Sequence, residues 1–464
     1  MRPLLYLLVF PTILLAAPEL RVGFAEVDVS PKLDPKKPVY MAGFGHNRLA
    51  TKVHDPIMAR AVVLGDGTKK MAWVSVDVVG LFFPVAEDVR GQLKGFDYVA
   101  VCSTHNHEGP DTLGLWGRSP FESGLEPEYQ KRIVAGCVEA ITTADKALSP
   151  AVARIGLAND ASLLRDGRLP EVKHDEILTL RFDKPGAKAD DKPLGVLVQW
   201  NVHPELLSDK NTELSADHVG YTVSYLKQQF GCPVAYFTGT VGGLMTNLSL
   251  PLKGKNGELL KDGTFEKTEA YGVAVGKLAE KALGTVKEIT LTPFTLRFSA
   301  VMLPVENPLY RMAWTAGVLK RSMYEWTGEA QPKEWKLAKD AKKTVGLKTE
   351  VGLLSLGELD VALIPGEIYP ELVLDKIQEP VDAGADFPDA PKEPAIYPQM
   401  KGKYKIMIGL ANDEIGYIIP KRQWDEQKPY CYGLKNAQYG EINSCGPNVA
   451  PVLCEAFKGL GKSK

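Results

Sequence analysis

The chain has 464 residues, of which 45% are hydrophobic and 24% are charged, and its formal net charge is −2. This composition is that of an ordinary globular protein with a large buried core. The near-neutral charge gives no electrostatic basis for binding nucleic acid or an acidic membrane surface. The length would permit two or three domains, although single α/β domains of this size are common.

The N-terminus differs in composition from the rest of the chain. A short basic start is followed by an apolar run over residues 4–15 and by Ala16 and Ala17. This pattern predicts a signal peptide over residues 1–17 and hence a secreted or periplasmic protein. An uncleaved anchor is the alternative, because Leu15 and Pro18 do not suit a cut after Ala17.

Six cysteines are present, and none of them forms a C-x-x-C pair. If the chain is exported, Cys431 with Cys445 or Cys454 is the plausible local disulfide. Cys102 and Cys232 lie in apolar runs and are predicted to be buried thiols.

Short apolar runs alternate with stretches of helical periodicity, which predicts an α/β fold. In chain order, the predicted strands are residues 71–79, 98–103, 194–202, 234–238, 361–364 and 405–410. One predicted helix begins at Pro127 and covers residues 127–141, and two more cover residues 219–230 and 268–283. We expect a layered domain with mixed central β-sheets and helices packed outside.

Two segments are predicted to be surface elaborations. Residues 326–350 are rich in Lys and Glu and are expected to form exposed helices, whereas residues 379–403 are rich in Pro, Ala and Asp and predict a long loop. Neither segment divides the chain, so residues 18–464 are predicted to form a single domain.

Three histidines follow predicted strands. His105 and His107 come directly after the strand at 98–103, and His203 ends the apolar run 196–202. In an extended backbone, residues i and i+2 point to the same side, so His105 and His107 can converge on one point. Imidazole is the commonest zinc donor, although each histidine could also be an ordinary hydrogen-bonded side chain in a loop.

Two more predicted strands lead into groups that can bind a metal. Glu367 follows the strand at 361–364, and Tyr417 follows the strand at 405–410. A single Glu or Tyr after a strand is usually a cap or a solvent contact. Here four separate strands end in such a group, and three donors with an open position are typical of catalytic zinc.

The ordered set of motifs resembles the catalytic domain of the neutral/alkaline non-lysosomal ceramidase family. The motifs are His105-Asn106-His107-x-Gly109-Pro110, Asn201-Val202-His203-Pro204, Pro365-Gly366-Glu367 and the run from Gly409 through Asn412, Asp413, Gly416 and Tyr417 to Pro420. They occur in the family's order, and the resemblance covers residues 21 to 450.

The resemblance implies a Zn²⁺ ion bound by His105, His203, Glu367 and Tyr417. It places His107 beside the metal as the catalytic group that donates a proton or contacts the oxyanion. It also implies hydrolysis of the amide bond of an N-acyl lipid such as ceramide, with possible transient contact with a membrane surface. No protein partner is predicted. The alternatives are a zinc esterase or other acyl hydrolase, and an exported binding protein without activity.

The chain departs from the family pattern at several positions. Glu108 replaces a small hydroxyl residue and adds a carboxylate that could change substrate preference. Residues 238–247 have few polar side chains, so no serine nucleophile is assigned. The sequence ends soon after Tyr417, and the family's C-terminal immunoglobulin-like domain is therefore expected to be absent.

Supporting roles near the site are predicted for further residues. Asp217 or Asp111 could hold a ligand histidine in its correct tautomer, although an exposed aspartate is an equal alternative. Leu113, Leu115 and Trp116 follow the His-x-His motif and could line a groove for an acyl chain or pack the loop onto the body.

Overall fold

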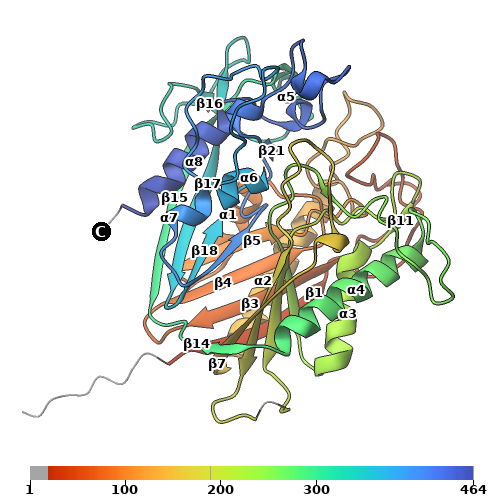
Figure 1. Ribbon diagram of the computed structural model, residues 1–464, viewed down its shortest axis with the longest axis vertical. Coiled ribbons are helices and arrows are strands. Elements are labelled where there is room, and N and C mark those ends of the chain that lie inside the picture. The colour runs from red at the N-terminus through yellow and green to blue at the C-terminus, as the bar shows by residue number, and fades with distance from the viewer. Residues whose placement is uncertain (1–18, 189, 463–464) are drawn as a thin grey trace, which may run out of the picture.

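Three mixed sheets of five strands each form the framework of the protein in the computed structural model (Figure 1). The structure describes residues 19–188 and 190–462, so the predicted signal peptide at 1–17 lies outside the described residues. The α/β class, with mixed central sheets and helices packed outside, is confirmed.

The strands of each sheet are given in spatial order. The first sheet contains β5 (Tyr98–Ser103), β4 (Lys70–Val76), β3 (Met58–Gly65), β1 (Arg21–Asp28) and β6 (Ser149–Pro150). The second contains β12 (Val234–Thr238), β10 (Gly195–Trp200), β9 (Glu176–Asp183), β7 (Val152–Asn159) and β14 (Lys287–Ile289). The third contains β15 (Phe294–Val305), β17 (Val345–Leu356), β18 (Leu359–Leu363) and β20 (Tyr404–Ile408), with β16 (Met323–Glu325) beside β17.

Each sheet includes one parallel pair among antiparallel neighbours. The pairs are β4 with β5, β10 with β12, and β18 with β20. These six strands are almost wholly buried, which explains why their sequences are continuous apolar runs rather than alternating ones. The carboxyl ends of these pairs deliver the histidines, Glu367 and Tyr417.

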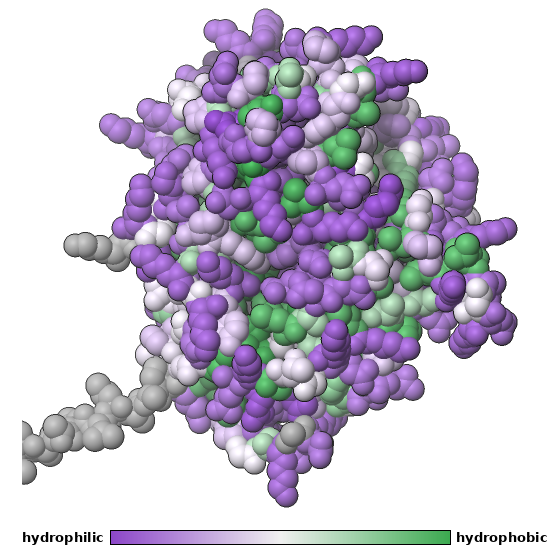
Figure 2. Space-filling model, in the orientation of Figure 1, coloured by the Kyte–Doolittle hydropathy of each residue, from purple (hydrophilic) through white to green (hydrophobic). Residues whose placement is uncertain are grey.

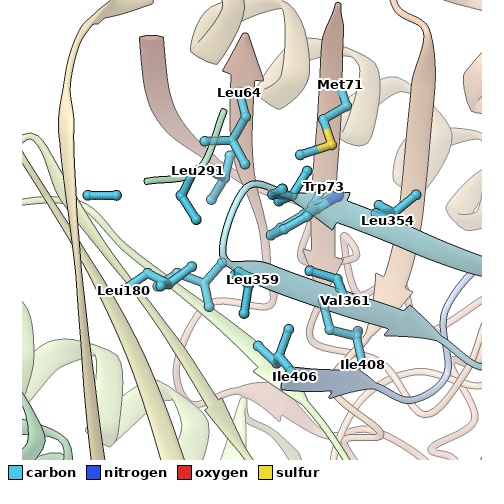
Figure 3. Packing of buried hydrophobic residues seen from close by; sticks show 14 of the residues in the cluster. Leu64, Met71, Trp73, Leu180, Leu291, Leu354, Leu359, Val361, Ile406 and Ile408 are labelled. Carbon is cyan, nitrogen blue, oxygen red and sulfur yellow. The ribbon is translucent and has the colours of Figure 1, made fainter. Parts of the chain in front are cut away.

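The three sheets share one apolar core. Figure 3 shows Leu64 and Trp73 of the first sheet close to Leu354, Val361 and Ile408 of the third, and the same buried cluster includes side chains of β7 and β9. Burial of a large apolar side chain stabilises a fold by about 1.5–3 kcal/mol. This shared core therefore fixes how the strand ends of different sheets sit relative to one another.

Helices cover the outer faces of the sheets. Helix α2 (Pro127–Lys146) begins where the Glu126 side chain accepts a hydrogen bond from the Tyr129 N–H, and its apolar face packs on the first sheet. Helices α3 (Asp217–Phe230) and α4 (Phe265–Leu283) lie side by side on the second sheet, and α8 (Val449–Leu460) packs on the third (Figure 1).

The remaining elements are short. Helix α1 (Phe83–Gln92) precedes β5, and the others are α5 (Pro308–Thr315), α6 (Pro370–Leu374) and α7 (Ile396–Gln399). Three two-stranded pairs complete the fold, namely β2 (Lys52–Val53) with β11 (Glu213–Leu214), β8 (Arg165–Asp166) with β13 (Met245–Thr246), and β19 (Glu367–Ile368) with β21 (Tyr417–Ile418).

The prediction of helices in residues 326–350 was wrong, although residues 326–344 are exposed or half-buried as expected. No helix lies there in the described chain; residues 345–350 instead begin β17, the strand between β15 and β18. Its Lys348 and Glu350 suggested solvent exposure, but Glu350 is buried, and its charge is balanced by Arg90, 2.8 Å away. The segment 379–403 is mostly loop as predicted, with α7 as its only helix among described residues.

All six cysteines lie in the described residues and are free and buried, so the predicted disulfide of Cys431 is absent. Burial of Cys102 and Cys232 is confirmed. No helix among the described residues is long and apolar enough to cross a bilayer. The face shown in Figure 2 is largely hydrophilic, with hydrophobic residues in small groups.

Candidate metal centre

The carboxyl ends of strands from all three sheets meet at one place. The Asn412 N–H donates to the Val101 carbonyl at 2.7 Å, and the Val101 N–H donates to Asn412 Oδ1 at 2.9 Å. The Gly409 N–H reaches the Thr238 carbonyl at 3.0 Å. The chain after β20 is therefore joined to β5 on one side and to β12 on the other.

His105 and His107 converge as predicted, but for a different reason. Strand β5 ends at Ser103, and His105 has a φ of 66°, in the left-handed region that few residues other than glycine adopt. A turn therefore brings the two rings together, with their centroids 4.8 Å apart. The His107 N–H donates to the Pro204 carbonyl at 2.9 Å, which holds this turn against the loop of His203.

Glu367 and Tyr417 are direct neighbours in a small parallel ladder. Strands β19 and β21 pair in parallel, with Glu367 opposite Tyr417. The two residues are 50 positions apart in the chain, yet the register sets their side chains next to each other. Sequence spacing alone gave no indication of this pairing.

The four residues predicted to bind metal place their polar atoms at short distances. Glu367 Oε2 lies 3.0 Å from His203 Nε2 and 3.2 Å from His105 Nε2, and the Tyr417 hydroxyl lies 3.4 Å from His203 Nε2. Zinc–ligand bonds of about 2.0–2.1 Å at tetrahedral angles separate ligand atoms by about 3.3–3.4 Å. These three contacts are of a length that ligands of one ion would have, and they link the four residues through Glu367 and His203.

The tautomers of His105 and His203 are fixed by backbone carbonyls. His105 Nδ1 is 2.7 Å from the Val79 carbonyl, and His203 Nδ1 is 2.8 Å from the Met245 carbonyl. Because a carbonyl only accepts, each Nδ1 carries a hydrogen, and each Nε2 is the ring atom left to face Glu367. Two imidazole nitrogens that share one carboxylate oxygen favour a cation between them, whether a proton or a metal ion.

Asp111 and Asp217 do not hold these histidines, so that prediction was wrong. Asp111 accepts hydrogen bonds from the N–H groups of Leu113, Gly114 and Trp116, at 2.7–2.9 Å. Asp217 accepts from the N–H groups of Leu207 and His218. Both aspartates are buried and hold loops in place through backbone hydrogen bonds. The sequence does not distinguish this role from the support of a histidine.

His107 differs from the other two histidines. In the described structure neither of its ring nitrogens has a hydrogen-bond partner, and its Nδ1 lies 3.7 Å from Glu205 Oε2. Burial, and then the positive fields of His105 and His203, hold the pKa of His107 well below its usual value. The ring is therefore neutral, with an accepting nitrogen available.

Gly43 makes room for His107. A Cβ at this position would lie 2.4 Å from the Cβ and Cγ of His107, and the φ of Gly43 is +95°. Glu205, on the other side, is buried and accepts a 2.5 Å hydrogen bond from the Thr246 hydroxyl. His107 thus sits in a socket formed by a glycine and a fixed carboxyl group.

The three histidines could together hold a metal ion, since one ligating nitrogen of each lies within 4.8 Å of the other two. Burial favours the neutral form of Glu367, but His105 and His203 outweigh this and hold its pKa well below the usual range. Burial, and then Glu367, raise the pKa of Tyr417 well above its usual value. Tyr417 would need a nearby cation to ionise.

A cavity of about 410 Å³ opens above these residues. His105, His107, Glu367 and Tyr417 form part of its floor. Its walls are largely apolar and include Leu113, Leu115, Trp116, Leu309, Met312 and Leu319. Leu113 and its neighbours therefore do both things proposed for them, because they line the cavity and also pack in a buried cluster with Phe82.

Glu108 is turned away from the cavity. Its Oε2 accepts hydrogen bonds from Arg48 at 3.0 Å and from Asn211 at 2.8 Å. Arg48 in turn donates to the backbone carbonyls of Ala42 and His107. Glu108 thus adds a carboxylate close to the site, but it does not line the cavity and instead supports the backbone of His107 through Arg48.

A carboxyl group that sequence reasoning missed does line the cavity. Glu414 Oε1 accepts a 2.7 Å hydrogen bond from the Gly416 N–H, and within the described residues its buried Oε2 has no partner. Burial, and then Glu367, raise the pKa of Glu414 well above its usual value. Its position inside the motif that contains Asn412 and Tyr417 was the available signal.

The model of the neutral/alkaline non-lysosomal ceramidase N-terminal region matches residues 21–233. These residues belong to that family. The match contains His105, His107 and His203, whereas Glu367 and Tyr417 lie beyond it. The family resemblance predicted from the motifs is therefore confirmed over residues 21–233.

Two solved structures share the fold of nearly the whole chain. The neutral ceramidase from Pseudomonas aeruginosa matches with a TM-score of 0.69 at 17% identity, over 96% of this chain and 74% of that one. A structure described as ceramidase complexed with C2 matches with a TM-score of 0.68 at 17% identity, over 96% and 75%. At this identity the likeness shows the fold alone. The shared fold covers 96% of this chain, so it reaches beyond the family match at residues 21–233.

Proposed function

We propose that this ceramidase-family protein is a zinc-dependent hydrolase that cleaves the amide bond of an N-acyl lipid. The observation that carries the proposal is a set of three contacts beneath an apolar cavity. Glu367 Oε2 lies 3.0 Å from His203 Nε2 and 3.2 Å from His105 Nε2, and the Tyr417 hydroxyl lies 3.4 Å from His203 Nε2. Two nitrogens and two oxygens of this kind suit Zn²⁺.

When bound there, zinc would supply a Lewis acid that polarises a carbonyl and lowers the pKa of water. The chain's own residues supply the rest. The apolar walls take up an acyl chain and exclude water, which strengthens polar interactions on the floor. His107 is the candidate catalytic residue: its neutral ring can accept a proton from the attacking water and pass it to the leaving amine.

The choice of an N-acyl lipid as substrate rests on the cavity and on relatives. A ceramidase of the same fold was solved in complex with C2. Several cavity residues at the mouth are exposed and apolar, including Phe121 at 68%, Met312 at 51% and Leu309 at 45%. Such residues suit transient contact with a lipid surface.

We also propose that the protein is exported and that its residues 1–17 are a signal peptide.

The test measures zinc by elemental analysis and hydrolysis of a fluorescent short-chain ceramide in the same samples. Wild type is compared with His105→Ala and with His174→Ala, which removes a buried histidine that bonds Thr240 outside the cavity. About one zinc per chain and turnover, both lost only in His105→Ala, is the expected result. Zinc with ester but not amide cleavage would favour the esterase alternative, and a wild type that cannot be loaded with zinc would overturn the mechanism.

A further inference from the structure

A second pocket lies between the second and third sheets. It has a volume of about 420 Å³, and its lining comes from β7 and β9 of the second sheet, β20 of the third, and helices α6 and α7. Pockets of this size hold small molecules. Because the second pocket shares no lining residue with the cavity above the histidines, amide hydrolysis there leaves it unexplained.

Positive charge prevails in the lining of the second pocket. Two carboxyl groups face it, those of Asp175 and Glu176. Four lysines face it as well, namely Lys173, Lys376, Lys403 and Lys405. Burial, and then Asp175, raise the pKa of Glu176, which weakens the negative charge of the lining further. In a chain whose net charge is −2, this local excess of lysine favours an anion as the ligand.

Most of these lysines keep their charge available for a ligand. Lys376 Nζ has no hydrogen-bond or ion-pair partner in the part of the chain that the structure describes. Lys405 and Lys173 each donate to a backbone carbonyl, at 2.7 and 3.1 Å. A neutral carbonyl does not cancel the charge of an ammonium group, which has two further hydrogens to donate. Lys403 differs, since it pairs with Glu358 at 2.9 Å.

A buried histidine lines the same pocket. His174 is 5% exposed, and its Nδ1 lies 2.5 Å from the Thr240 hydroxyl oxygen. The Thr240 hydroxyl donates its own hydrogen to Asn201 Oδ1 at 3.1 Å, so Nδ1 is the donor toward Thr240. Burial lowers the pKa of His174 to about 4, so the ring is neutral and Nε2 is an acceptor. Among the described residues, Nε2 has no hydrogen-bond partner.

The lysines and the histidine together select one kind of anion. Lysine ammonium groups are common partners of phosphate. An accepting Nε2 in the same pocket requires that the anion also has a hydrogen to donate. A carboxylate and a sulfate have none at neutral pH, whereas inorganic phosphate retains one and a phosphate monoester retains one until its second ionisation, at a pH of about 6.

We propose that the second pocket binds a phosphate group that still carries a hydrogen. The lysines balance its charge, and His174 Nε2 accepts its hydrogen. This site goes beyond the proposed hydrolysis and does not depend on it. The phosphate group can be free, part of a soluble phosphate monoester, or the head group of a lipid, because the same contacts recognise all three.

The test follows the ring signals of labelled histidines by NMR at a pH of about 6.5 while inorganic phosphate is added. The His174 signals are those that His174→Ala lacks. We expect them to shift with phosphate until the site is saturated, and to respond at least about tenfold more weakly to sulfate, which has no hydrogen for Nε2. Lys376→Met should weaken phosphate binding about fivefold, as expected for one partly exposed ion pair.

Lys210→Met is the matched control. Lys210 has a side chain that is 91% exposed and lies outside the pocket lining, so this variant should bind phosphate as the wild type does. Sulfate that binds as tightly as phosphate would overturn the assignment. A response confined to His105 or His203 would place the anion in the other cavity and overturn the second site, as would an unchanged affinity in Lys376→Met.

Two further ligands identify the source of the phosphate. A His174 response to glycerol 3-phosphate would support a soluble monoester. A response only to vesicles that contain phosphatidic acid would support a lipid head group. If inorganic phosphate alone produces the response, the pocket is a site for the free ion.

Discussion

Two buried acidic side chains, Glu441 beside Arg168 and Glu367 on the cavity floor, differ in what balances their charge. Around Arg168, Glu441 makes a two-fold ion pair at 2.6 and 2.8 Å, and Nη1 and Nη2 also donate to the carbonyls of Tyr439 and Gln423. On the cavity floor, Glu367 faces only His105 and His203 among the described residues within ion-pair distance.

The cations closest to the floor are already engaged. Arg48 pairs with Glu108, and Arg321 pairs with Asp413. The Arg168 cluster therefore carries a permanent counter-ion, whereas the groups that face Glu367 on the floor are the titratable rings of His105 and His203. This difference distinguishes a buried charge that stabilises the fold from a buried charge that binds a ligand.

The largest effect is expected from Glu367→Gln compared with Glu441→Gln. Glu367→Gln removes the carboxylate shared by both histidines, so we expect loss of zinc and a fall in amide hydrolysis of about 1000-fold or more, since bound zinc contributes several kcal/mol. Glu441→Gln should lower stability but keep zinc. Elemental analysis and kinetics on both proteins check this. Retention of zinc and activity by Glu367→Gln would contradict the need for a carboxylate at this position.

Arg168→Met is expected to have a large effect on stability rather than on zinc content. Removing one partner of a buried ion pair leaves an uncompensated charge and typically costs about 3–5 kcal/mol of stability. Urea unfolding should show this loss, while the zinc content of the folded protein stays near that of the wild type. A variant of wild-type stability that lost zinc would reverse the roles assigned to the two clusters.

An intermediate effect is expected from Glu205→Gln. Glu205 lies 3.7 Å from His107 Nδ1, and groups that orient a functional histidine typically contribute about 10- to 100-fold. We expect a loss of this size in kcat with little change in KM or zinc. Nitrogen NMR of labelled histidines should show the His107 tautomer shift, which a merely structural defect would not produce. Thr246→Val, which removes only the hydroxyl that bonds Glu205, should have a smaller effect.

The smallest effect is expected at the mouth of the cavity. Replacing Phe121 and Met312 by serine removes exposed apolar area, at a cost in lipid binding of about 25 cal/mol per Å² no longer buried. Hydrolysis of a substrate in vesicles should fall several-fold, while hydrolysis of a water-soluble short-chain substrate stays the same. Leu259→Ser is the control, because Leu259 is 66% exposed but does not line the cavity. An equal loss on both substrates would count against lipid contact.

Much of the fold could be predicted from sequence. The ranges expected for β5 and β12 agree with the structure, because fully buried strands are apolar throughout. Strand β17 was missed since its charged residues are paired across the fold: Glu350 reaches Arg90 from 260 positions away. Such pairing makes a buried strand look like a solvent-exposed segment.

The site could be predicted in part. His105 and His203 were found because each follows a recognisable strand, and Glu367 and Tyr417 because of a family resemblance. What fixes their geometry could not be found, since the carbonyls of Val79 and Met245 that orient the histidines carry no sequence signal. Glu414 was overlooked because nothing in the sequence distinguishes a free carboxyl oxygen from a paired one.

The link between Asn412 and Val101 has a consequence for how the protein is made. The two residues are 311 positions apart, so the strand that carries His105 and His107 obtains its last neighbour only when the end of the chain has been synthesised. Contacts this distant in sequence form late and slow the folding rate. Under the proposed function, metal capture therefore follows completed folding, and a chain truncated before Asn412 is expected to lack the assembled site.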